Sequence, residues 1–180
     1  MSSYWFPDTT VLCNFGAVKR LDLLQSIVAW RGRWTEAVHY EVTRSSDHVS
    51  ELTSVIDEGW LGEPIEVTSQ EAVKVERIRV ASFGGDEAEP LRHLGEAQTC
   101  HVIKTRPDLA GAVWLTDDEA AYDFGRQISI TTWDTREVLE LAISYGEINA
   151  EDALSLMRSM LDHDRSPRRV PAHHSEFGRR

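Results

Sequence analysis

The chain has 180 residues, with 30 Asp and Glu against 19 Lys and Arg side chains, so its formal net charge is −11. This length suits one domain whose core needs neither disulfides nor a structural metal, and the 41% hydrophobic content excludes a disordered chain. The acidic balance argues against nucleic-acid binding through a broad basic surface, but it leaves open that some carboxylates hold cations.

The sequence has no feature that predicts secretion or a membrane span. No apolar run approaches the roughly 18 residues needed to cross a bilayer, and the start MSSYWFPD lacks the basic and apolar regions of a secretory signal. The two cysteines, Cys13 and Cys100, have the spacing of neither a disulfide framework nor a metal finger. We therefore expect a cytoplasmic protein with reduced cysteines.

Short apolar runs alternate with longer amphipathic patterns along the first half of the chain, and this alternation is typical of an α/β fold. The predicted elements are a strand at 4–6 ended by Pro7, helices over 9–18 and 21–30, a second strand over 33–38, a helix over 40–57, a short strand over 64–67 and a helix over 69–83.

The second half continues the same alternation after an acidic loop at 86–90. It predicts a helix over 94–104, a buried strand over 110–115, a helix over 119–125, a strand over 128–131 and a helical pair over 132–145 and 149–161. We expect a three-layer α/β/α sandwich with a mostly parallel central sheet. Residues 1–162 would form this domain. The basic segment 163–180 would form a tail that is flexible, folds back on the acidic face or contacts RNA phosphates.

Acidic residues stand at several predicted element boundaries, and ligands of open α/β sheets bind beyond the carboxyl ends of the strands. Mg²⁺ and Mn²⁺ prefer oxygen ligands, and two such ions about 3.5–4 Å apart can activate a water for phosphodiester hydrolysis. Carboxylates from different elements could therefore form one metal site. The candidates are Asp8 after the first strand, Glu41 after the second, Glu96 early in the helix over 94–104, and Asp117 and Asp118 after the strand over 110–115.

Each acid also has an interpretation without function, and for a single position the pattern favours it. Asp8 and Asp118 precede predicted helices, where Asp is a common N-cap. Glu41 would be a first-turn acid favoured by the helix dipole. Glu96 would be a surface residue paired with Arg92 one turn earlier.

Four segments in order resemble the motifs of the PIN-domain family of metal-dependent nucleases, which includes the toxins of VapC-type toxin–antitoxin systems. Residues 8–15, DTTVLCNF, resemble the opening Asp-Thr motif with its aliphatic pair. HYEV at 39–42, LGEAQ at 94–98 and LTDD at 115–118 resemble the second, third and fourth motifs. The resemblance covers residues 4–131, and the helical pair that follows resembles one PIN subgroup.

This resemblance implies an α/β/α sandwich with a Mg²⁺- or Mn²⁺-dependent endoribonuclease site, RNA as substrate, a toxin role with an antitoxin partner, and a homodimer. The residues that it carries over as catalytic metal ligands are Asp8, Glu41, Glu96 and Asp118, with Asp117 as an alternative or additional ligand beside Asp118. Hydroxyl groups next to these acids would orient carboxylates or waters, and they belong to Thr9, Thr10 and Thr116.

Some residues depart from the family pattern. Cys13 and Asn14 stand where apolar or small residues are expected, and residues 61–85 are longer than in compact members. Among the histidines, His93 can share a helix face with Glu96. Two other functions stay open: a non-catalytic module of the same fold that binds a basic partner such as an antitoxin segment, and a phosphatase-like hydrolase that uses the same metals on small phosphomonoesters.

Overall fold

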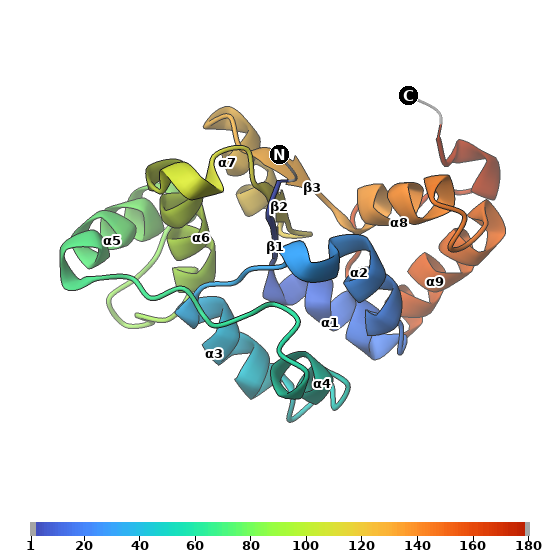
Figure 1. Cartoon of the computed structure of the whole chain (residues 1–180), viewed down its shortest axis with the longest axis horizontal. Coiled ribbons are helices and arrows are strands. Elements are labelled where there is room, and N and C mark those ends of the chain that lie inside the picture. Colours follow the sequence, from blue (N-terminus) through green and yellow to red (C-terminus); the bar gives the residue numbers. More distant parts are fainter. Residues whose placement is uncertain (1–2, 179–180) are drawn as a thin grey trace.

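A parallel three-stranded sheet forms the centre of the computed structural model, which describes residues 3–178 (Figure 1). Its strands are β1 (Trp5–Pro7), β2 (Val113–Leu115) and β3 (Thr131–Trp133), in the order β1-β2-β3. Phe6 pairs with Trp114, and Trp114 pairs with Thr132. Because the strands are parallel, their carboxyl ends meet at one edge of the sheet.

Alternating side chains of the sheet divide the core into two clusters. Trp5 and Leu115 face the larger cluster, whereas Phe6 and Trp114 face the smaller one. The larger cluster is completed by α1 (Thr9–Ala17), α2 (Leu21–Val28), α3 (Glu36–Ser45), α4 (Leu52–Asp57), α8 (Thr135–Ser144) and α9 (Ala150–Asp162). The smaller one is completed by α5 (Ser69–Phe83), α6 (Leu94–Thr105) and α7 (Glu119–Gln127). The predicted α/β class with a parallel sheet and helices on both faces is confirmed (Figure 1).

Capping residues explain why three of the helices begin where they do. Thr68 with Glu71, Asp134 with Glu137, and Asn149 with Asp152 form reciprocal capping boxes before α5, α8 and α9. Each box satisfies backbone N–H groups that have no partner within the helix. None of the helices in residues 3–178 is long and apolar enough to cross a membrane.

The predicted strand over 33–38 is wrong. The structure has only isolated bridges there, between Trp5 and Gly32 and between Thr35 and Ile65, so the expected strand over 64–67 is also reduced to one bridge. Thr35 is instead the N-cap of α3, and its hydroxyl accepts a hydrogen bond from the N–H of Val38. An N-cap followed by helix-forming residues outweighs the apolar alternation at this point.

Two other predicted boundaries also need correction. The helix over 40–57 is divided by a polar turn into α3 and α4, and the Ser46 hydroxyl donates to the carbonyl of Thr43 at 2.7 Å where α3 ends. The strand predicted over 128–131 begins three residues later, as β3. Ser129 has a positive φ of 61°, and the turn that it forms carries the chain from α7 back to the sheet.

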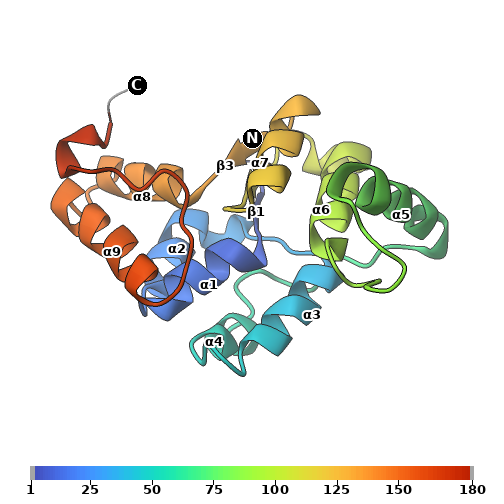
Figure 2. The ribbon, with the colours of Figure 1, turned by 180° about the vertical axis from the view of Figure 1, so that it is seen from behind.

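Residues 163–178 lie against the helical pair α8 and α9 (Figure 2). The Arg136 guanidinium donates to the Glu176 carbonyl at 2.7 Å, and Arg158 donates to the Ala172 carbonyl at 2.9 Å. Val170 and Phe177 pack against the larger core cluster. Residues 163–178 are therefore packed on the helical pair α8 and α9.

Candidate functional site

Asp8 follows β1 at the N-cap position of α1, but its side chain does not cap the helix. The carboxylate is 4% exposed, and its Oδ2 accepts hydrogen bonds from the Thr10 hydroxyl at 3.0 Å and the Thr116 hydroxyl at 3.1 Å. The N-cap interpretation therefore accounts for the backbone of Asp8 and leaves its carboxylate unexplained. Two hydroxyls from different elements hold that carboxylate in one orientation.

Glu41 lies in the middle of α3, so the interpretation as a first-turn acid is wrong. Its carboxylate reaches α1, where Oε2 accepts a hydrogen bond from the Thr9 hydroxyl at 2.7 Å. On the other side it meets α6 at Gly95, where an added Cβ would lie only 2.9 Å from Glu41 Oε1. A glycine at this position lets the carboxylate approach the α6 backbone, and the contact with the backbone of Gly95 partly opposes the rise in the pKa of Glu41.

Glu96 lies in the first turn of α6 and contacts His93, with 3.1 Å between Oε1 and the histidine Nδ1. Arg92 pairs with Glu89 instead, also at 3.1 Å, so the ion pair expected between Arg92 and Glu96 is not formed. His93 has a left-handed backbone with φ 61°, and its ring stacks on Phe83 of α5. The turn that begins α6 thereby brings the imidazole beside Glu96.

The carboxyl groups of Asp8, Glu41, Glu96 and Asp118 lie close enough to affect one another's ionisation, and we call these four residues the acidic site. Burial and then the charge of Asp8 raise the pKa of Glu41 and that of Glu96 to about 8 in each case. Burial also raises the pKa of Asp8, and the charge of Asp118 adds to this effect. Within residues 3–178, no Lys or Arg forms an ion pair with any of the four.

Asp117 and Asp118 are adjacent, but their carboxylates have different partners. Asp118 Oδ1 caps α7 by accepting from the N–H of Ala121 at 2.8 Å. Asp117 is saturated: Oδ2 accepts from the Asn14 amide at 2.7 Å and from the Thr135 hydroxyl, and Oδ1 accepts from the N–H groups of Thr135 and Arg168. Asp117 thus joins α1, α8 and the C-terminal segment, and Asp118 is the acid that faces Asp8.

The acidic site offers only oxygen donors, which suit a hard cation such as Mg²⁺ or Mn²⁺. Among residues 3–178, no three acidic, histidine or cysteine side chains already lie close enough to bind one ion together. Mg²⁺ usually keeps several waters and takes one or two carboxylates from the protein. The donor set therefore fits a hydrated ion better than an ion enclosed by protein ligands.

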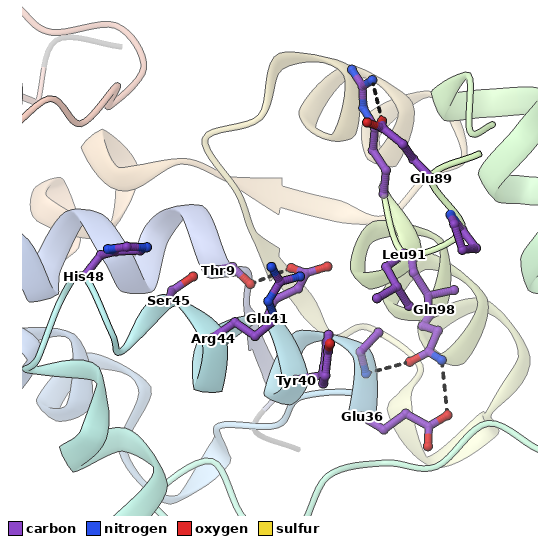
Figure 3. Close-up of a pocket in the computed structure, with 14 residues that line it drawn as sticks. Thr9, Glu36, Tyr40, Glu41, Arg44, Ser45, His48, Glu89, Leu91 and Gln98 are labelled. Carbon is purple, nitrogen blue, oxygen red and sulfur yellow. Dashed lines mark hydrogen bonds and ion pairs between the residues drawn. The ribbon is translucent and has the colours of Figure 1, made fainter. Parts of the chain in front are cut away.

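Two cavities meet at Thr9, next to the acidic site. The larger one, of about 1250 Å³, is the α3 groove, which runs between α3 and residues 89–94 and includes Glu41 (Figure 3). The smaller one, of about 380 Å³, contains Thr10, Asp118 and Arg165, so the C-terminal segment forms part of its wall. A ligand can therefore reach the acidic site from two sides.

Four residues around the site were not identified as functional from the sequence. Asn14 appeared only as a departure from the family pattern, although a buried polar side chain on an otherwise apolar helix face is a recognisable signal. Thr135 contacts Asp117 across 18 positions of sequence, which no local pattern reveals. Tyr40 and Arg44 lie on the same face of α3 as Glu41, and placing the start of this helix at Glu36 would have shown it.

The comparison with known families agrees with this geometry. A family model described as a PIN domain matches residues 5–170, which include the acidic site, all three strands and the helical pair. No curated protein and no solved structure matches the chain significantly.

Proposed function

The chain belongs to the PIN-domain family, and we propose that it is a Mg²⁺- or Mn²⁺-dependent ribonuclease that hydrolyses RNA phosphodiester bonds. The observation that carries this proposal is the acidic site itself. Carboxyl groups from four separate segments influence one another's ionisation in a largely buried place, and within residues 3–178 no lysine or arginine forms an ion pair with them. Perturbed carboxyls without a protein counter-charge are typical of a site that binds a cation.

Asp8, Glu41, Glu96 and Asp118 would hold the ion or ions. A bound divalent ion lowers the pKa of a coordinated water and neutralises charge that develops at the phosphorus. The chain contributes orientation, because the hydroxyls of Thr10 and Thr116 fix the carboxylate of Asp8 and the hydroxyl of Thr9 fixes that of Glu41. Such hydrogen bonds to ligand atoms are expected to keep the donor oxygens in position for the ion.

The negative charge of the acidic site predicts that RNA cleavage depends on a bound metal ion. Without a cation, the carboxylates would repel the phosphate of an approaching RNA. With a bound divalent ion, the local charge is reversed and a phosphodiester can approach. Cleavage should therefore require Mg²⁺ or Mn²⁺ and stop when a chelator removes them.

The Asp8→Asn variant tests this proposal. The amide has nearly the shape of the carboxylate and can still accept from Thr10 and Thr116, so the fold should persist while the negative charge is lost. We expect Mg²⁺- or Mn²⁺-dependent cleavage of an oligoribonucleotide to be abolished, with thermal unfolding recorded to show that the variant is folded. The matched control is Asp123→Asn, an exposed acid on α7, which should cleave as the unmodified chain does.

Three results would contradict the proposal or favour another function. Unchanged cleavage by the Asp8→Asn variant would remove the acidic site from the mechanism. If the unmodified chain binds no divalent ion by calorimetry and cleaves no RNA, the non-catalytic module with a basic partner becomes the better assignment. Metal-dependent hydrolysis of small phosphomonoesters, with no activity on RNA, would favour the phosphatase-like hydrolase.

A further inference from the structure

The α3 groove has one wall made from a single face of α3. Residues 36, 37, 40, 41, 44 and 45 of α3 line it, and their spacing of three and four positions places them on the same side of the helix, whereas His48 lines the groove from the turn that follows α3. Glu41 therefore lies between Tyr40 and Arg44 along this face (Figure 3). The groove therefore includes Glu41, one of the four residues of the acidic site.

The groove exposes two large apolar side chains that the fold leaves uncovered. Tyr40 on α3 is 47% exposed, and Leu91 on the opposite wall is 46% exposed. Figure 3 shows both of them in the groove, with Gln98 on the same side as Leu91. A concave surface with an exposed aromatic ring is a common place for a flat ligand to bind.

The groove also contains a cation that no carboxylate neutralises. Among residues 3–178, Arg44 forms no ion pair, whereas Arg92 is paired with Glu89 at 3.1 Å. The guanidinium carbon of Arg44 lies 5.9 Å from the centre of the Tyr40 ring, so the two side chains are neighbours at the surface. In a chain with a net charge of −11, this unpaired arginine provides a local attraction for an anion.

An aromatic face, an unpaired arginine and adjoining carboxylates are the features that a nucleotide chain would contact in turn. We propose that the α3 groove binds the nucleotide next to the cleaved phosphodiester, with its base stacked on Tyr40 and its phosphate paired with Arg44. This inference rests on the proposed ribonuclease function. A folded peptide would use the apolar surface, but it would give no reason for a free arginine beside the metal-binding carboxylates.

Stacking on Tyr40 restricts the kind of RNA that fits. A base in a duplex is already stacked between its neighbours, whereas an unpaired base can be splayed onto a protein side chain. The groove should therefore select single-stranded RNA over duplex RNA. Stacking tolerates all four bases, so we expect little sequence preference at this position.

The test compares Tyr40→Ala, Tyr40→Phe and the matched control Tyr145→Ala, where Tyr145 is a 61% exposed tyrosine at the end of α8. Binding of a fluorescent single-stranded oligoribonucleotide is followed by anisotropy, and KM is obtained from cleavage. Loss of base stacking should weaken binding and raise KM by about tenfold in Tyr40→Ala. Tyr40→Phe keeps the ring and should bind like the unmodified chain, as should Tyr145→Ala.

Two further measurements tie the effect to the base and the phosphate. In a series of oligonucleotides, one base is removed at a time, at each successive position. When the missing base is the one that stacks on Tyr40, the unmodified chain and the Tyr40→Ala variant should bind the oligonucleotide equally well. Arg44→Ala should weaken binding and reduce the slope of log K against log salt by about one, as expected for the loss of one phosphate contact.

The outcomes separate this inference from the proposed function. If the chain cleaves RNA but Tyr40→Ala matches Tyr145→Ala in binding and KM, the base-stacking assignment is overturned and the nuclease assignment stands. If no variant cleaves RNA but single-strand binding still depends on Tyr40, the groove assignment is supported and the nuclease assignment fails. If Tyr40→Ala instead weakens self-association in sedimentation with RNA binding unchanged, the groove is a protein contact and the inference is overturned.

Discussion

The acidic site, which is partly buried, and the pair formed by Asp117 and Asp134, which is buried, are both groups of carboxylates, yet their neighbours have opposite character. Asp134 is fully buried, accepts from the Glu137 N–H and pairs with the Arg169 guanidinium at 2.6 Å. Asp117 accepts four hydrogen bonds. In the acidic site, by contrast, hydroxyl groups contact Asp8 and Glu41, a histidine contacts Glu96 and the Ala121 N–H caps Asp118, and among residues 3–178 no Lys or Arg pairs with any of the four.

This difference separates the acids that hold the fold together from those to which we assign the proposed metal site. Burial raises the pKa of Asp117 as it does that of Asp8, so burial alone does not distinguish the two groups. The two groups differ in the hydrogen-bond donors and cationic side chains that the protein places beside each carboxylate. This matters because a buried charge is tolerated only when it is paired or neutralised. Asp117 and Asp134 fasten the C-terminal segment to the domain, whereas the acidic site has no protein cation to neutralise it among residues 3–178.

The largest loss of stability is expected when the carboxylate of Asp117 is removed. Asp117→Ala leaves the Asn14 amide and the Thr135 hydroxyl buried without their acceptor. We expect the free energy of unfolding to fall by about 3 kcal/mol or more, since each unsatisfied buried group costs about 1–3 kcal/mol. Urea denaturation measures it, with Asp123→Ala on the exposed face of α7 as control. An unchanged unfolding midpoint would mean that Asp117 does not hold these elements together.

An effect of the opposite sign, which depends on pH, is expected in the acidic site. The pKa of Glu41 is about 8 in the folded chain against an ordinary 4.5, so the folded state binds more protons than the unfolded state between these values. The free energy of unfolding of the metal-free protein should therefore fall as pH rises from about 4.5 to 8. Glu41→Gln should lessen this fall and be more stable than the unmodified chain at the upper end.

Denaturation in a chelator at both ends of this pH range measures the effect. Glu63→Gln, at an exposed position with no ion pair, serves as the control and should keep the slope of the unmodified chain. Equal slopes in Glu41→Gln and Glu63→Gln would show that the carboxylates of the acidic site do not destabilise one another.

The smallest effect on stability is expected for Asp118→Asn, although its effect on activity should be large. Asn caps a helix about as well as Asp, so α7 should keep its N-cap and stability should change by less than about 0.5 kcal/mol. Loss of the negative charge should lower metal-dependent cleavage by at least about tenfold. Denaturation and cleavage are measured on the same preparation. A stability loss as large as that of Asp117→Ala would contradict the distinction between the two adjacent aspartates.

The local parts of the fold could be predicted from the sequence because their causes lie within a few residues. The helix over 69–83 is defined by its Thr68–Glu71 capping box and by Gly84, which has a left-handed backbone where the helix ends. The segment before α3 was predicted incorrectly because two local signals compete there. The apolar side chains of Trp34 and Val38 indicate a strand, whereas the signal for a helix is the single N-cap residue Thr35. Errors arose where two local signals overlapped.

The sequence by itself determined the α/β class, the helices with clear caps, and the acids that stand at the ends of elements. Only the tertiary structure decided which of these acids meet, since Thr9 and Glu41 are 32 positions apart and Asp8 and Thr116 are 108 apart. It also decided that Asp117 turns toward Asn14 and Thr135 while Asp118 faces Asp8. Such contacts depend on how helices pack across the sheet, and this packing depends on the whole chain at once, whereas capping and periodicity act within one or two turns.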